Sequence, residues 1–225
     1  MRLIGRMKHT LALPATDPKP AGYDAAEGQN MTRLLIIGPP GSGKGTQAVH
    51  IARHFSIPTV STGDIFRTNV SQETPLGVEA AKYLDDGAFV PDELTNALVK
   101  DRLQESDLEP GFLLDGYPRT ATQVTELDNM LASRSQRLDA VVELRAQDSE
   151  LEQRMLQRAK EQGRKDDTIE VFRHRLDLYH RETHEVVAVY AGRGMLVSVD
   201  GSGEPGAITE RAIAAVEKFL AEGVA

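Results

Sequence analysis

The feature that most constrains the fold is a glycine-rich segment, residues 38–43, between an apolar run and an amphipathic stretch. The apolar run at 34–37 is typical of a buried strand, and a helical pattern begins directly after Gly43. Glycines let the backbone N–H groups of such a loop converge on one phosphate, and the helix N-terminus adds a favourable dipole. Lys44 supplies a mobile positive charge. The segment therefore predicts a strand–loop–helix unit that binds phosphate.

Strand and helix signals alternate from Arg33 to the end of the chain. The short apolar runs predict strands near 34–37, 58–61, 112–115, 140–144 and 195–199. Helical patterns cover 43–55, 121–133, 149–162, 168–191 and 206–221, and three more begin near 63, 75 and 91. This alternation predicts an α/β fold with a five-stranded parallel sheet flanked by helices. In the first helix we expect Val49, Ala52 and Phe55 to share the buried face.

The composition excludes several classes of protein. The chain has 225 residues, 40% of them hydrophobic and 27% charged, which suits one α/β domain. A formal net charge of −8 argues against a general affinity for nucleic acid or anionic membranes. The absence of cysteine excludes disulfides and thiolate zinc sites, so no zinc is expected. No apolar run is long enough to span a bilayer, and we expect a cytoplasmic protein.

Residues 1–30 differ in composition from the rest of the chain. Between Leu13 and Asn30, prolines and glycines are interspersed with alanine, aspartate and glutamate, and apolar content is very low. Such a segment cannot bury enough surface to order itself, so we predict a disordered N-terminal extension. A natural start at Met31 and an organelle-targeting segment are the alternatives, although the apolar region of a signal peptide is missing.

Four ordered segments resemble the motifs of the nucleoside monophosphate kinases, and of the adenylate kinases above all. They are GPPGSGKGTQ at 38–47, STGDIFR at 61–67, GFLLDGYPRTATQ at 111–123, and GRKDD at 163–167 with Arg175 following. The resemblance covers about 31–222 and implies a nucleotide kinase domain at 31–225. Within it, the resemblance implies a P-loop kinase core, a small monophosphate-binding lobe at about 61–90 and a short lid at about 157–167.

The resemblance implies reversible phosphoryl transfer from Mg²⁺-ATP to AMP, giving two ADP, in a monomer. The implied catalytic residues are Lys44, Asp115, Arg119, Arg164 and Arg175. The implied ATP-binding residues are Gly41, Ser42, Gly43, Lys44, Gly45, Thr46, Arg154, Arg158 and Gly203. The implied AMP-binding residues are Thr62, Arg67, Ala88, Phe89, Val90, Gly116, Tyr117, Pro118, Arg119, Gln123, Arg164 and Arg175.

The position after the P-loop lysine departs from the usual pattern. Most P-loop proteins carry a Mg²⁺-ligating serine or threonine there, whereas this chain has Gly45. We therefore expect no direct protein ligand for Mg²⁺, which would rest on phosphate oxygens and water, with Asp115 orienting the waters. The acceptor phosphate has a second pKa near ~6 and is mostly dianionic at neutral pH, so the reaction requires no general base.

Thr62 and Gln123 indicate which nucleotide is the acceptor. The arginines of the lid are weaker evidence for nucleotide binding. In the resembled family, Thr62 and Gln123 accompany adenine, whereas pyrimidine-specific relatives tend to carry alanine and asparagine there. Arginines suit phosphate because the planar guanidinium binds two oxygens at once. For Arg154 and Arg158 a solvated surface role is the alternative, and Gln162 replaces an expected lid arginine. A kinase for UMP or CMP and a non-catalytic nucleotide sensor remain as alternative functions.

Overall fold

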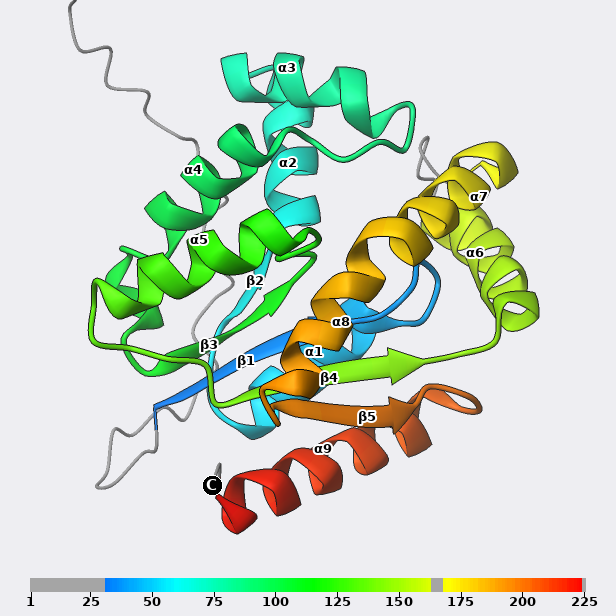
Figure 1. Ribbon diagram of the computed structural model, residues 1–225. Coiled ribbons are helices and arrows are strands. Elements are labelled where there is room, and N and C mark those ends of the chain that lie inside the picture. The colour runs from blue at the N-terminus through cyan, green and yellow to red at the C-terminus, as the bar shows by residue number, and fades with distance from the viewer. Residues whose placement is uncertain (1–30, 163–167, 224–225) are drawn as a thin grey trace, which may run out of the picture.

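The computed structural model (Figure 1) describes residues 31–162 and 168–223, apart from the side chains of 158–162. One sheet has the strand order β2-β3-β1-β4-β5, and every strand pair in it is parallel. The strands are β1 (Thr32–Ile37), β2 (Thr59–Ser61), β3 (Gly111–Asp115), β4 (Ala140–Arg145) and β5 (Leu196–Asp200). The predicted five-stranded parallel sheet is confirmed, while the extension expected at 1–30 lies outside the described residues.

Helices connect the strands and cover both faces of the sheet (Figure 1). They are α1 (Lys44–His54), α2 (Thr62–Ser71), α3 (Pro75–Leu84), α4 (Asp92–Arg102), η1 (Ser106–Leu108), α5 (Ala121–Ala132), α6 (Asp148–Gln162), α7 (Ile169–Leu178), η2 (Tyr179–Thr183), α8 (His184–Gly192) and α9 (Pro205–Glu222). Most predicted ranges agree within one or two residues, which is the ordinary uncertainty of a helix end. Among these described helices, none is both long and apolar enough to cross a membrane.

The helical stretch predicted at 168–191 is confirmed, and its middle contains a turn that was not predicted. A π-helical turn, η2, joins α7 to α8. A π turn accommodates one extra residue and is frequent at functional sites. The apolar pattern does not reveal it, because the positions before and after the turn each keep a period of 3.6. As a result, Tyr179 and Thr183 both line the cleft described below.

The core consists of two layers separated by the sheet. In β1, Leu34 and Ile36 belong to a cluster with residues of α1 and α9. Their neighbours Leu35 and Ile37 belong to the opposite cluster, which contains residues of α2, α4, α5 and α8. Alternate side chains of a strand point to opposite faces, so a strand that is apolar at every position is buried on both sides. This explains why 34–37 reads as a continuous apolar run.

The buried face of α1 is rotated from the predicted one. The predicted core residue Val49 is 49% exposed, whereas the polar Gln47 is 1% exposed. The Gln47 amide donates to the Pro205 carbonyl at 3.1 Å and accepts from the Thr209 hydroxyl at 2.7 Å. Because both ends of the amide are hydrogen-bonded, its burial against α9 carries little penalty. A hydrophobicity pattern cannot anticipate a buried side chain of this kind.

The strand register brings three loops together at one edge of the sheet. Asp115 at the end of β3 pairs with Ile36 in β1 and with Ser61 in β2. The segments that follow these strands therefore leave the sheet at the same edge, and they contain the glycine-rich loop, the start of α2 and residues 116–120. Ligands of open α/β sheets bind in the crevice outside the carboxyl ends of the strands.

Candidate active site

A cleft of about 780 Å³ opens at this carboxyl edge. The predicted site residues that line it are Gly41, Ser42, Gly43, Lys44, Gly45, Thr46, Arg67, Ala88, Phe89, Asp115, Gly116, Tyr117, Pro118, Arg119, Arg154, Arg175 and Gly203. An adjoining cavity of about 30 Å³ is lined by Thr62, Val90 and Gln123, and shares residues such as Phe89 and Arg119 with the cleft. Arg164 and the side chain of Arg158 lie outside the described residues, as does the side chain of Gln162.

The glycine-rich loop depends on glycine at particular positions. A Cβ at Gly38 would lie 2.6 Å from the Leu144 carbonyl oxygen, so a side chain there would clash with β4. Gly41 has φ +82° and would place a Cβ 2.8 Å from the Leu151 carbonyl oxygen. Because positive φ is costly for other residues, the loop can follow this path only with glycine at position 41. The loop is thus pressed against β4 and α6 on one side and faces the cleft on the other.

The N-terminus of α1 is left open toward the cleft. Its N-cap, Gly43, has φ +87°, makes no side-chain cap hydrogen bond, and is followed by no acidic residue in the first turn. The first N–H groups of this helix are therefore not satisfied by a cap, and an anion can satisfy them. The Lys44 ammonium donates to the Pro39 carbonyl at 2.8 Å and lines the cleft, as a phosphate-binding lysine requires.

Asp115 lies beside the first turn of α1 and is influenced by the charges of Lys44 and Arg119. A Cβ built on Gly45 would be 3.7 Å from the Asp115 Oδ2, so the first turn of α1 passes directly beside the carboxyl group. Burial raises the pKa of Asp115 above its usual range, while the positive charges of Lys44 and Arg119 act in the opposite direction. Ionisation of this carboxyl therefore depends on nearby cations, and a divalent ion would favour it further.

Arg119 is anchored along its length. Its backbone N–H donates to Gln123 Oε1 at 2.7 Å, and its carbonyl oxygen accepts from the Thr183 hydroxyl at 3.2 Å. The side-chain Nε donates to the Gly116 carbonyl at 2.7 Å, and the guanidinium carbon lies 5.1 Å from the centre of the Phe89 ring. These contacts fix the guanidinium in the cleft, where its two terminal nitrogens can bind a phosphate.

Three of the predicted arginines share one electrostatic environment. Burial lowers the pKa of Arg119 to about 10; Asp115 opposes this shift, and Arg175 and Arg67 add to it. Arg67 donates to the Asp64 carboxylate one turn earlier in α2, and Arg175 donates to the Leu84 carbonyl at 3.4 Å. A buried guanidinium beside two further cations favours the binding of an anion, because the anion offsets both burial and repulsion.

The small cavity beside Arg119, called the base pocket below, combines apolar walls with two buried polar side chains. Val90 and Phe66 give it apolar walls, and Thr62 and Gln123 are the polar side chains, each only 2% exposed. The Thr62 hydroxyl donates to the Asp115 carbonyl at 3.4 Å. Both residues were predicted to read the acceptor base, and the structure brings them to the same cavity.

Tyr117 was predicted to bind the acceptor, but its side chain points into the core. It is 1% exposed and belongs to the cluster formed with α4, α5 and α8. Its hydroxyl donates to Asn96 Oδ1 at 2.8 Å and lies 3.2 Å from the Gln123 carbonyl. We therefore expect the ring of Tyr117 to support the loop from beneath rather than to contact a ligand.

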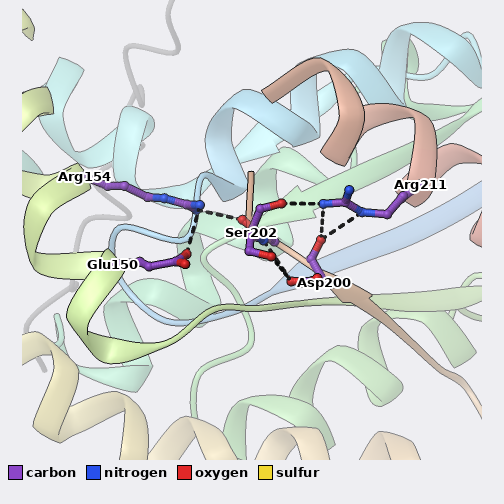
Figure 2. A network of polar contacts seen from close by, with 6 residues as sticks. Glu150, Arg154, Asp200, Ser202 and Arg211 are labelled. Atoms are coloured by element: carbon purple, nitrogen blue, oxygen red, sulfur yellow. Dashed lines mark hydrogen bonds and ion pairs between the residues drawn. The ribbon is translucent and has the colours of Figure 1, made fainter. Parts of the chain in front are cut away.

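A network of polar contacts surrounds the loop that follows β5. Figure 2 shows Arg154 of α6 and Arg211 of α9 reaching this loop from opposite sides. The Arg154 guanidinium donates to the Gly201 carbonyl at 2.8 Å and lies 3.3 Å from Glu150 Oε2. The Arg211 Nη2 donates to the Asp200 carbonyl at 2.9 Å and to the Ser202 carbonyl at 2.6 Å.

The same loop is stabilised from within. The Ser202 hydroxyl and backbone N–H both donate to Asp200 Oδ1, at 2.7 and 2.9 Å. These hydrogen bonds hold the pKa of Asp200 below its usual range. Gly203, predicted from the resemblance alone, follows this turn with φ +94° and lines the cleft. The loop is thus held in one conformation by its own hydrogen bonds and forms part of the cleft lining.

Several cleft residues were not predicted. They are Gln47, Ser61, Gly63, Asp64, Leu84, Gln157, Tyr179, Thr183, Pro205 and Ile208 among the lining residues, together with Asp92 behind Gln123. Thr120 and Gln123 form the T-x-x-Q pattern of a capping box, which could have indicated that the amide of Gln123 is held at a helix start. No local signal marks Thr183. Among the described residues, no three histidine, aspartate or glutamate side chains gather to hold a metal ion.

Comparison with known proteins agrees with this geometry. A family profile described as adenylate kinase matches residues 36–195. A protein named adenylate kinase from Pseudarthrobacter chlorophenolicus is 59% identical over 187 residues, which cover 83% of this chain and 97% of that protein. Proteins of the same name from Micrococcus luteus and Renibacterium salmoninarum are 59% and 56% identical over 83% of this chain, and the matches cover 91% and 97% of those proteins. The chain therefore belongs to the adenylate kinase family of phosphotransferases.

Proposed function

We propose that the chain transfers the γ-phosphoryl group of Mg²⁺-ATP to AMP, reversibly and within the 780 Å³ cleft, so that two ADP are formed. The observation that carries the proposal is that one cleft is lined by two groups of residues suited to phosphate, together with the buried Asp115. One group is the glycine-rich loop with Lys44, and the other is Arg67, Arg119 and Arg175 beside the base pocket. A cleft with two phosphate-binding regions is what a transfer between two nucleotides requires. The reaction would serve adenine nucleotide homeostasis and AMP salvage.

The transfer itself needs no proton shuttle. A phosphate oxygen of AMP attacks the γ-phosphorus, and the bond from that phosphorus to the β–γ bridging oxygen breaks. The bridging electron pair stays on the departing ADP, while the AMP has become the second ADP. The protein contributes alignment and neutralisation of charge, which dominate catalysis of phosphoryl transfer. This agrees with a site that is rich in arginine.

The residues of the cleft divide between the donor ATP and the acceptor AMP. Lys44 and the N–H groups of residues 41–46 would bind the donor phosphates, and Arg119 and Arg67 would bind the phosphate of AMP. Arg175 would bridge the two, together with Arg164. Mg²⁺ enters as the ATP complex, and Asp115 would orient its water ligands. Arg154 donates to Gly201 and pairs with Glu150, and binding to the donor phosphates would compete with these contacts.

We also propose that two segments close over the nucleotides. The lobe at about 61–90 carries Arg67 and part of the wall of the base pocket, and the lid at about 157–167 carries Arg158 and Arg164. Closure would exclude water, because hydrolysis of ATP competes with transfer to AMP. We further propose a cytoplasmic monomer that binds ATP, ADP and AMP, and neither nucleic acid nor membranes, in keeping with its net charge of −8.

Two alternatives make different demands on the site. A kinase for UMP or CMP would use the same scaffold, but Thr62 and Gln123 offer hydrogen bonds that suit adenine. A nucleotide sensor would bind ATP without turnover and would not need arginines on the acceptor side. Calorimetric titration separates the sensor from the kinase, since a kinase binds AMP and ATP at two sites. AMP is titrated into the protein alone and into protein loaded with a non-hydrolysable ATP analogue. Saturable AMP binding to the loaded protein supports the kinase. Failure to bind AMP with or without the analogue contradicts it.

A further inference from the structure

The amide of Gln123 is held at both ends. Its Oε1 accepts from the backbone N–H of Arg119 at 2.7 Å. Its Nε2 donates to Asp92 Oδ1 at 2.6 Å. The side chain is 2% exposed and borders the base pocket. Since an amide nitrogen carries two hydrogens and an amide oxygen two lone pairs, each end keeps one further hydrogen-bonding position for a ligand.

These two contacts define which way the amide points. A backbone N–H can only donate and a carboxylate can only accept, so each recognises one end of the amide. Rotating the amide by a half turn would bring two N–H groups together at Arg119 and two oxygens together at Asp92. Both hydrogen bonds would be lost in a buried site, where unsatisfied polar groups are costly. The observed orientation is therefore imposed from two sides.

The carboxylate that provides one of these contacts is itself fixed. Asp92 is the first residue of α4, and its Oδ2 accepts from the Thr120 hydroxyl at 3.0 Å. Thr120 is the N-cap of α5, and its hydroxyl accepts from the backbone N–H of Gln123 at 3.2 Å. Asp92 thus ties the start of α4 to the start of α5, and both of its oxygens are engaged.

Amide orientation matters because adenine and guanine present opposite patterns to a glutamine. Adenine offers the N6 amino group as donor beside N1 as acceptor, whereas guanine offers O6 as acceptor beside N1–H as donor. One amide can pair with either base if it is free to rotate by a half turn. It can therefore discriminate between them only when its orientation is fixed by its surroundings. A pocket that leaves polar groups unpaired rejects the wrong ligand strongly.

We propose that Asp92 is a positioning residue that makes the acceptor site selective for adenine over guanine by fixing the amide of Gln123. The inference rests on the proposed function, because it assumes that a purine monophosphate enters this pocket. Asp92 touches Gln123 and Thr120 and acts through the glutamine. The ligand class is a purine nucleoside monophosphate whose edge presents a donor beside an acceptor in the order found in adenine.

The test compares Asp92→Asn with the matched control Glu93→Gln. Asparagine keeps the shape of aspartate but can donate as well as accept, so it no longer excludes the rotated amide. Glu93 is the exposed neighbour on the same helix turn, and its substitution removes the same charge without touching Gln123. For each protein kcat/KM is measured with AMP and with GMP at saturating Mg²⁺-ATP. The inhibition of AMP phosphorylation by GMP is measured in parallel.

We expect Asp92→Asn to lower the preference for AMP over GMP by about tenfold, with tighter inhibition by GMP, because a charged hydrogen bond is exchanged for a neutral one. Glu93→Gln should keep the wild-type preference, and both variants should unfold near the wild-type temperature. An unchanged preference in Asp92→Asn overturns the role of Asp92, and so does an equal loss of efficiency with both acceptors. A wild-type protein that does not phosphorylate AMP overturns the proposed function instead.

Discussion

The hydroxyl of Thr183 donates to the carbonyl oxygen of Arg119 at 3.2 Å, so the π-helical turn between α7 and α8 supports the loop that carries the acceptor arginine. Thr183 is 5% exposed and also lines the cleft. The turn therefore does more than interrupt a helix. Through one hydrogen bond it links α7, which bears Arg175, to the backbone of Arg119.

Replacing Thr183 by valine should weaken the acceptor side specifically. Valine keeps the shape of threonine but removes the hydroxyl, and a hydrogen bond of this kind contributes about 1 kcal/mol. We expect the KM for AMP to rise by about fivefold, while the KM for ATP stays near the wild-type value. Thr183→Ser, which keeps the hydroxyl, should have a KM for AMP close to the wild-type value. Equal increases of both KM values in Thr183→Val would show that the residue serves packing alone.

Lys44 and Arg119, the two cations that act most strongly on Asp115, should dominate turnover. We expect Lys44→Ala or Arg119→Ala to lower kcat by about 10²–10³, because each removes a preorganised charge from the transferred or acceptor phosphate. Lys218→Ala is the matched control, since its side chain is 75% exposed on α9. Steady-state rates and thermal unfolding, measured on all three variants, separate chemistry from folding. Near-normal turnover in Lys44→Ala or Arg119→Ala would contradict the site.

Asp115 should lower the stability of the folded protein while supporting its activity. Its pKa is raised in the folded protein, chiefly by burial, so the ionised carboxylate destabilises the fold as pH rises through that pKa. We expect Asp115→Asn to unfold at a higher temperature than the wild type at neutral pH without nucleotide. This difference should shrink as the pH is lowered toward the ordinary aspartate range, where both side chains are neutral.

The same substitution should impair catalysis. Loss of a residue that orients the ligands of a metal typically costs about 10–100-fold, and we expect that range for kcat with Mg²⁺-ATP. Thermal unfolding scans over a series of pH values, combined with rates at one pH, test both effects. A variant that is less stable than the wild type at neutral pH, or as active, would show that Asp115 has been misassigned.

The Glu150–Arg154 pair should compete with the donor nucleotide. The two side chains are 42% and 29% exposed and 3.3 Å apart, so their interaction is worth less than about 1 kcal/mol. Glu150→Ala removes this competitor, and we expect the KM for Mg²⁺-ATP to fall by about two- to threefold. Glu152→Ala serves as control, because Glu152 lies on the same helix and pairs with Arg173 instead. A higher KM in Glu150→Ala would mean that Glu150 presents Arg154 to the nucleotide.

Much of the fold was predictable because local signals were consistent. Continuous apolar runs such as 34–37 identify strands buried on both faces, and the glycine-rich loop has few alternatives at residues 38–43. The predictions failed where tertiary contacts override the pattern. Val49 is exposed although it is apolar, and Gln47 is buried because α9 satisfies its amide. The π turn between α7 and α8 was not predicted from the apolar pattern.

The sequence motifs pointed to many of the residues that line the cleft but did not reveal the residues that support them. Lys44 and Arg119 lie in segments whose residue types predict phosphate binding. Asp92 and Thr183 lie in ordinary helical stretches, and their importance follows only from the distances to Gln123 and Arg119. Tyr117 lines the cleft as part of its motif, but its side chain is buried in the core, which the motif does not reveal.

The most direct test of the account is the formation of ADP by the purified protein with Mg²⁺-ATP and AMP, GMP, CMP, UMP or dTMP in turn. We expect rapid turnover with AMP, with the other four acceptors slower by orders of magnitude. Turnover that prefers a pyrimidine nucleotide would contradict the assignment of Thr62 and Gln123 while leaving the phosphate machinery in place. No turnover with any of the five would contradict the central claim that this cleft transfers a phosphoryl group between two nucleotides.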